Sequence, residues 1–156
     1  MFSVHYAGCD GRAMKSLSEI LAMSGNASLR VLLVEDSSLL AERIAELIAC
    51  LPEVDLVDIV DNELAALSSI RTEAPDVVIL DLHLRSGTGF GVLRSMRRAA
   101  AAAAPKFVIL SNFGLPEYRR EAEALGAEVF LDKSRDYFRL PTVLLDYARR
   151  RSTRTH

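Results

Sequence analysis

Five short apolar runs, each followed by a stretch with helical spacing, constrain this chain more than any other feature. The runs cover residues 31–34, 56–60, 77–80, 107–110 and 128–131. Short runs rich in Val, Ile and Leu are typical of strands that are buried on both faces. We therefore expect a sheet whose two faces are both covered.

The intervening stretches predict five helices. They cover residues 37–50, 62–74, 88–101, 116–126 and 136–150. Ser37 and Asn62 are residue types that cap helix starts, and Pro116 stands where a first-turn proline belongs. Gly126 is suited to ending the fourth helix, and Pro141 is expected to delay the regular start of the fifth.

Alternating strands and helices predict an α/β fold with a parallel, doubly wound sheet. The commonest five-stranded arrangement of this kind is flavodoxin-like, with strand order 2-1-3-4-5. We expect one domain over residues 29–150. Residues 1–28 lack periodicity and are predicted to be a poorly ordered N-terminal extension, and residues 151–156 a basic C-terminal tail.

Composition excludes several classes of protein. Among 156 residues, Lys plus Arg number 19 and Asp plus Glu 21, a balance unlike that of a dedicated nucleic-acid binder. No apolar stretch approaches the ~20 residues that span a bilayer. Two cysteines, Cys9 and Cys50, are too few for a disulfide scaffold or a cysteine zinc site, and we expect free thiols. The lipoprotein-like box that ends at Cys9 has no apolar segment before it, so we predict a cytoplasmic protein.

Polar residues stand at the carboxyl ends of four predicted strands. They are Glu35, Asp36, Asp81, Ser111 and Lys133. Carboxyl ends of parallel strands share one sheet edge, where ligands bind. Clustered carboxylates repel one another unless a cation joins them, and Mg²⁺ prefers such oxygen ligands. A lysine and a hydroxyl beside them predict a phosphoryl-transfer site in which a carboxylate is the nucleophile.

Four motifs in this order make residues 29–150 resemble the receiver domain of bacterial two-component response regulators. They are Val34-Glu35-Asp36, Leu80-Asp81-Leu82 followed by Gly89, Leu110-Ser111, and the run from Gly126 to Lys133. The resemblance implies that Asp81 is the phosphoacceptor and that Lys133 pairs with the phosphate. It also implies that Ser111 and Phe130 are the switch hydroxyl and switch aromatic.

The resemblance further implies a magnesium site made by Glu35, Asp36, Asp81 and the backbone carbonyl of His83. The chain departs from the family where Ser134 replaces the usual proline after the lysine. It departs again where Asn112 replaces a very small residue after the switch hydroxyl. His83 and Phe113 stand at positions that tune phosphoryl lifetime in this family.

These features predict a single-domain response regulator. A sensor histidine kinase or histidine phosphotransfer protein would phosphorylate Asp81, and a surface change would carry the signal. The expected downstream surface combines helices 116–126 and 136–150 with the strand at 128–131, and a homodimer is left open. We do not expect an enzyme, a membrane partner or a nucleic-acid partner. One alternative is an unphosphorylated interaction module with a receiver-like fold, and another is a small phosphohydrolase that acts on external substrates.

Overall fold

The structure is a computed structural model that describes residues 28–100 and 102–154. Its strands are β1 (Leu29–Val34), β2 (Val54–Val60), β3 (Val77–Leu80), β4 (Lys106–Ser111) and β5 (Ala127–Asp132). Its helices are α2 (Ser38–Ala49), α3 (Glu63–Glu73), α4 (Gly89–Ala99), α5 (Pro116–Ala124) and α6 (Leu140–Arg154), with a 3₁₀ turn, η1, at Tyr137–Arg139. The predicted extension lies outside the described residues except for Ser28.

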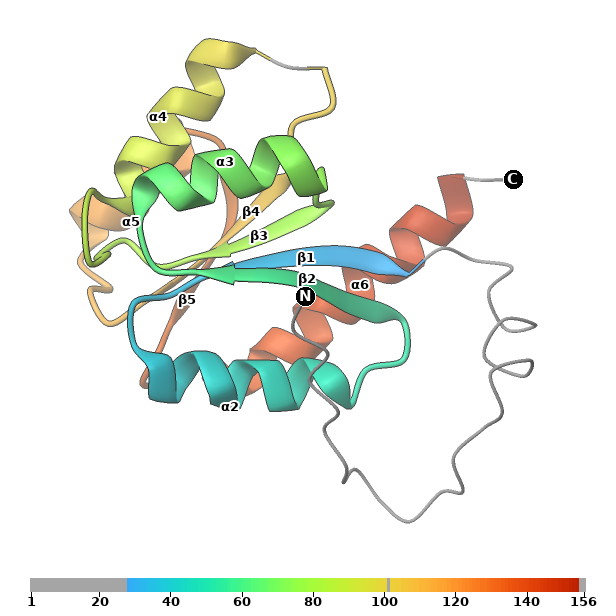
Figure 1. The fold of residues 1–156 in the computed structure, drawn as a ribbon. Coiled ribbons are helices and arrows are strands. Elements are labelled where there is room, and N and C mark those ends of the chain that lie inside the picture. Colours follow the sequence, from blue (N-terminus) through green and yellow to red (C-terminus); the bar gives the residue numbers. More distant parts are fainter. Residues whose placement is uncertain (1–27, 101, 155–156) are drawn as a thin grey trace.

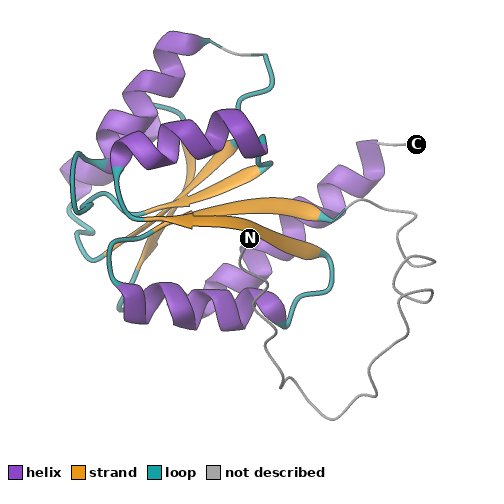
Figure 2. Cartoon of the chain, in the orientation of Figure 1, coloured by secondary structure: helices purple, strands orange, loops and turns teal. Residues whose placement is uncertain are grey.

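The strands form one parallel sheet in the order β2-β1-β3-β4-β5, which confirms the predicted topology. Helices α3, α4 and α5 cover one face, and α2 and α6 cover the other (Figure 1). The view by secondary structure shows the same three layers, with loops gathered at the two ends of the strands (Figure 2). The site described below lies at the carboxyl ends of the strands.

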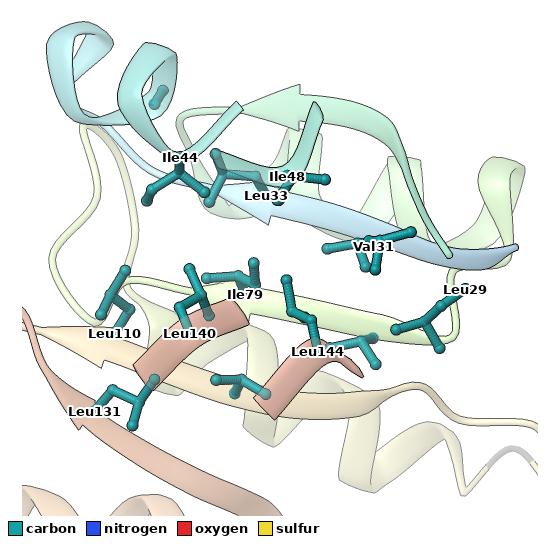
Figure 3. Close-up of a cluster of buried hydrophobic side chains, with 14 residues drawn as sticks. Leu29, Val31, Leu33, Ile44, Ile48, Ile79, Leu110, Leu131, Leu140 and Leu144 are labelled. Carbon is teal, nitrogen blue, oxygen red and sulfur yellow. The ribbon is translucent and has the colours of Figure 1, made fainter. Parts of the chain in front are cut away.

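Both faces of the sheet are packed, as the continuous apolar runs predict. One cluster joins the sheet to α2 and α6 and includes Leu33, Ile44 and Leu140, all fully buried (Figure 3). The other joins it to α3, α4 and α5 and includes Val92 and Phe130. Two separate cores hold the central strands rigidly, which fixes the positions of the residues at their ends.

The helix starts follow the local chemistry of the sequence. The Ser37 hydroxyl accepts a hydrogen bond from the amide of Leu40, and the Asn62 side chain accepts one from the amide of Ala65. These contacts satisfy amides that have no partner within a first helical turn. Pro116 occupies the first turn of α5, as predicted.

The last predicted helix divides into two elements. The 3₁₀ turn η1 precedes α6, and Pro141 lies in the first turn of α6, so the regular helix starts late as expected. Helix α6 then continues to Arg154, four residues beyond the predicted end. Arg151 explains the extension, because its guanidinium contacts Asp76 and the carbonyl of Ser28 and ties the helix end to the sheet.

One cysteine prediction is wrong. Cys50, directly after α2, is disulfide-bonded and not a free thiol. A low cysteine count excludes a disulfide scaffold but not a single disulfide. Cys9 lies outside the described residues.

The described residues include no helix with both the length and the apolar character needed to cross a membrane.

Candidate functional site

The sheet brings the predicted polar residues to one edge. The amide of Asp81, directly after β3, donates to the carbonyl of Val34, so the ends of β1 and β3 meet. The amide of Lys133, directly after β5, donates to the carbonyl of Ser111 at a distance of 3.0 Å. These backbone bonds place residues that are far apart in the sequence around one point.

Lys133 is the centre of this group. Its ammonium nitrogen lies 2.8 Å from Oε2 of Glu35 and 2.8 Å from Oδ2 of Asp81. The three side chains are only 10%, 1% and 5% exposed, respectively. Because burying an unpaired charge is costly, each of these groups depends on the others for its charged form.

The pKa values of Glu35 and Lys133 are both shifted in the folded protein. Burial raises the pKa of Glu35 to about 7, although hydrogen bonds from Lys133 and from the amide of Ser37 oppose the rise. The nearby charge of Asp81 adds to it. Burial alone would lower the pKa of Lys133, but hydrogen bonds with Asp81 and Glu35 outweigh it, and the pKa is raised. Lys133 therefore remains protonated at neutral pH.

A third carboxylate completes an acidic group. Glu35, Asp36 and Asp81 each offer an oxygen within 4.8 Å of the others. Asp36 is exposed, and with Glu35 it borders an open hollow that Ser38, Glu42, Asp61 and Arg85 also line. If all three carboxylates are ionised, the single ammonium of Lys133 leaves two negative charges, a balance that suits a divalent cation with oxygen ligands.

The loop after β3 returns toward Asp81. The amide of His83 donates to Oδ1 of Asp81 at 3.2 Å, so both oxygens of this carboxylate are hydrogen-bonded. The His83 side chain is exposed, and its ring lies 4.2 Å from the ring of Phe113, centroid to centroid. The ring of Phe113, from the loop after β4, thus packs against His83 in the loop that carries Asp81.

The two predicted switch residues lie on neighbouring strands. Ser111 is completely buried at the end of β4, and its hydroxyl accepts a hydrogen bond from the amide of Phe113. Phe130 on β5 is buried in the core on the α5 side. The guanidinium of Arg119 lies 4.6 Å from the centre of the Phe130 ring and donates to the Phe130 carbonyl.

Sequence reasoning missed several residues around this site. Arg119 covers Phe130, but nothing in the local pattern of α5 indicates that contact. Glu63 accepts a hydrogen bond from the amide of Thr88 and so joins the start of α3 to the loop before α4. The carboxylate of Asp132 closes the turn after Lys133, and its spacing to Ser134 is a recognisable signal for such a turn.

Comparisons with known proteins agree with this geometry. The family model described as the response regulator receiver domain matches residues 31–144. A protein-glutamate methylesterase/protein-glutamine glutaminase from Myxococcus xanthus is 34% identical over 86 residues, which cover 55% of this chain and 24% of that protein. The transcriptional regulatory protein CitB from Klebsiella pneumoniae is 31% identical over 126 residues, which cover 81% of this chain and 53% of CitB.

A solved structure shares the fold. A DNA-binding response regulator of the LuxR family from Staphylococcus aureus matches with a TM-score of 0.70 and 25% identity, covering 77% of this chain and 98% of that one. The chain spans only about a quarter to a half of the curated relatives named above. What those proteins do through their remaining parts is therefore not carried over to this chain.

Proposed function

Because this chain belongs to the response regulator receiver domain family, we propose that it acts as a response regulator receiver whose Asp81 accepts a phosphoryl group. The donor is a phosphohistidine on a sensor kinase or on a histidine phosphotransfer protein. The observation that carries the proposal is the contact of Lys133 with Asp81 and Glu35 at the sheet edge, each at 2.8 Å. A buried carboxylate whose pKa is shifted by burial and by a specific charged partner, as Glu35 is beside Lys133, marks a candidate functional site.

The chemistry follows from the position of each group. A carboxylate oxygen of Asp81 attacks phosphorus, the phosphorus–nitrogen bond to the donor imidazole breaks, and the imidazole leaves with that electron pair. Lys133 already contacts Asp81, so its charge is available to the phosphoryl oxygens as they arrive. The amide of His83 holds the other oxygen of Asp81 and fixes the carboxylate plane.

The donor set also fits magnesium. Glu35, Asp36, Asp81 and the backbone carbonyl of His83 would hold the ion, which when bound supplies positive charge against the phosphoryl oxygens. The support is the negative charge that Lys133 leaves unneutralised when all three carboxylates are ionised, with their oxygens within 4.8 Å of one another. Asp36 is exposed and accessible to a hydrated cation, whereas Glu35 and Asp81 are buried.

We assign to Ser111 and Phe130 the transmission of the signal from phosphorylated Asp81 to the protein surface. Phosphate on Asp81 draws the Ser111 hydroxyl toward it, and the orientation of Phe130 changes with that movement. Ser111 lies on β4 and Phe130 on β5, and these strands share core clusters with α5 on one face and α6 on the other, so the response reaches the surface formed by α5, β5 and α6. A two-state surface of this kind is biased by the free energy of the new contacts at the phosphate.

In this proposal the protein is not an enzyme for external substrates. It catalyses only its own phosphorylation and dephosphorylation, in the cytoplasm, and acts by binding a protein. The methylesterase and transcriptional activities belong to the longer relatives named above and are not part of this proposal. A homodimer through the α5–β5–α6 surface is one form that this binding could take.

The second candidate is an interaction module that keeps the fold without phosphorylation. Ser134 and Asn112, which depart from the family pattern, favour it. A titration with Mg²⁺, followed by NMR of the backbone amides, separates the two candidates. The receiver predicts saturable shifts at residues 35, 36, 81 and 83 that the Asp36→Asn variant loses. No shift at millimolar Mg²⁺ would favour the interaction module.

A further inference from the structure

The turn after Lys133 is built on the carboxylate of Asp132. Its Oδ1 atom accepts hydrogen bonds from the Ser134 amide at 2.8 Å, from the Ser134 hydroxyl at 2.5 Å and from the Arg135 amide at 3.2 Å. The amide of Asp132 in turn donates to the side chain of Asp136 at 3.1 Å. Residues 132–136 are thus closed by two aspartates that hold backbone groups at both ends of the turn.

These contacts fix the backbone on both sides of Lys133. The peptide group before it is held because the Lys133 amide donates to the carbonyl of Ser111. The peptide group after it is held because the Ser134 amide donates to Asp132. With both peptide groups fixed, the direction in which the Lys133 side chain leaves the backbone is fixed as well.

The second oxygen of Asp132 faces the loop that follows Ser111. A methyl group added to Gly114 would lie 2.8 Å from Oδ2 of Asp132, closer than side-chain atoms normally approach. Gly114 therefore leaves the space that the carboxylate needs. Asp132 lies between the turn that carries Lys133 and the loop that follows Ser111.

We propose that Asp132 is the positioning residue for Lys133. Its carboxylate supplies by hydrogen bonding the rigidity that a proline at position 134 would supply through its ring. One consequence of the inference, an effect on the rate of phosphoryl transfer to Asp81, rests on the proposed function. The positioning itself concerns the unphosphorylated protein and can be tested without a donor.

The experiment compares four variants with the wild type. Asp132→Ala removes the acceptor, Asp132→Asn keeps one oxygen that can accept from the two amides, and Gly114→Ala displaces the carboxylate without removing it. Asp146→Ala is the control, because it removes one carboxylate, as Asp132→Ala does, but away from the turn. Asp146 is exposed on α6, where it pairs with Arg150. Each variant is first checked for folding by its thermal midpoint.

The first readout is the proton–nitrogen NMR signal of the Lys133 ammonium. An ammonium held by two carboxylates exchanges its protons slowly and gives such a signal, whereas a solvated one does not. We expect the signal in the wild type, in Asp132→Asn and in the control, and its loss in Asp132→Ala and Gly114→Ala. An unchanged signal in folded Asp132→Ala would overturn the proposal.

The second readout is the rate of Mg²⁺-dependent phosphorylation, together with the Mg²⁺ concentration at half-saturation. We expect Asp132→Ala to slow the rate about tenfold while half-saturation changes less than about twofold. A general loss of structure would change both the rate and the Mg²⁺ concentration at half-saturation. If the wild type is phosphorylated and Asp132→Ala is phosphorylated at the same rate, the inference about Asp132 is overturned while the proposed function stands. If the wild type accepts no phosphoryl group, the proposed function fails, and the ammonium signal still decides the positioning.

Discussion

The ammonium of Lys133 lies 2.8 Å from Oδ2 of Asp81, a residue 52 positions earlier in the chain. The same ammonium lies 2.8 Å from Glu35. The proposed phosphoacceptor is therefore buried against the group that neutralises it, and the two carboxylates share one cation. This relationship makes the site sensitive to the loss of any one of the three side chains.

Removal of the shared cation is expected to destabilise the fold. Lys133→Met leaves Glu35 and Asp81 buried and facing each other, which should lower the free energy of unfolding at pH 8 by about 3 kcal/mol. The loss of unfolding free energy should be smaller at pH 5.5, where a proton bound by one carboxylate can take over the role of the ammonium charge. Urea denaturation at the two pH values measures it.

The control for that prediction is Lys106→Met. Lys106 pairs with Glu128 at 2.9 Å, but its side chain is 51% exposed. Removal of such an exposed pair costs less than about 1 kcal/mol. Equal losses in the two variants would contradict the view that burial makes the Lys133 cluster different.

The raised pKa of Glu35 predicts a pH dependence of stability. The folded pKa is about 7 and the ordinary value is 4.5, so between these values the folded state binds more protons than the unfolded state. Stability contributed by this group is complete below pH 4.5 and is lost as pH rises through 7. In metal-free buffer, Glu35→Gln should remove this decline, which is on the order of 3 kcal/mol. Denaturation midpoints of both proteins from pH 4.5 to 8 test it, and parallel curves would contradict it.

Loss of Asp36 is expected to weaken magnesium binding with little effect on folding. Asp36 is exposed, whereas its neighbour Glu35 is buried in contact with Lys133. Removing one charged ligand should weaken Mg²⁺ binding at least ~tenfold. Calorimetric titration of Asp36→Asn measures the affinity, and a thermal midpoint within about 2 °C of the wild type is the check on folding. Unchanged affinity would exclude Asp36 from the metal site.

The buried hydroxyl of Ser111 should be needed for the response more than for phosphoryl transfer itself. Ser111→Ala also leaves the amide of Phe113 without its acceptor, which should cost about 1 kcal/mol of stability. After phosphorylation, the wild type should show altered amide hydrogen exchange in α5, β5 and the start of α6. The variant should be phosphorylated and show no such change, and a normal response would remove Ser111 from the switch.

The fold and the edge of the sheet that carries the site could be predicted because few local signals determine them. Buried strand runs and helical spacing specify a parallel sheet, and parallel strands bring their carboxyl ends to one edge. Glu35, Asp81 and Lys133 were therefore expected at the same edge of the sheet, although β4 separates β3 from β5. Their exact pairing depended on side-chain packing and could not be inferred from spacing.

Contacts between different elements could not be predicted either, because they also depend on how distant parts of the chain pack. Arg119 covers Phe130 because α5 packs beside β5, and no periodicity in α5 distinguishes Arg119 from Arg120. The close approach of the Asp132 carboxylate to Gly114 depends on how the end of β5 lies beside the loop after β4, which the whole sheet determines. The extended end of α6 likewise depends on Asp76, which lies far away in the sequence.

The most direct test of the account is the intact mass of the protein after incubation with Mg²⁺ and a phosphodonor. Both a small phosphodonor and a phosphorylated histidine kinase are used, because Asn112 directly follows Ser111 in the sequence and is expected to hinder one donor more than the other. The account predicts a gain of ~80 Da, the mass of one phosphoryl group, that requires Mg²⁺ and is absent in Asp81→Asn. No gain with either donor, or an equal gain in Asp81→Asn, would contradict the assignment of Asp81 as the phosphoacceptor.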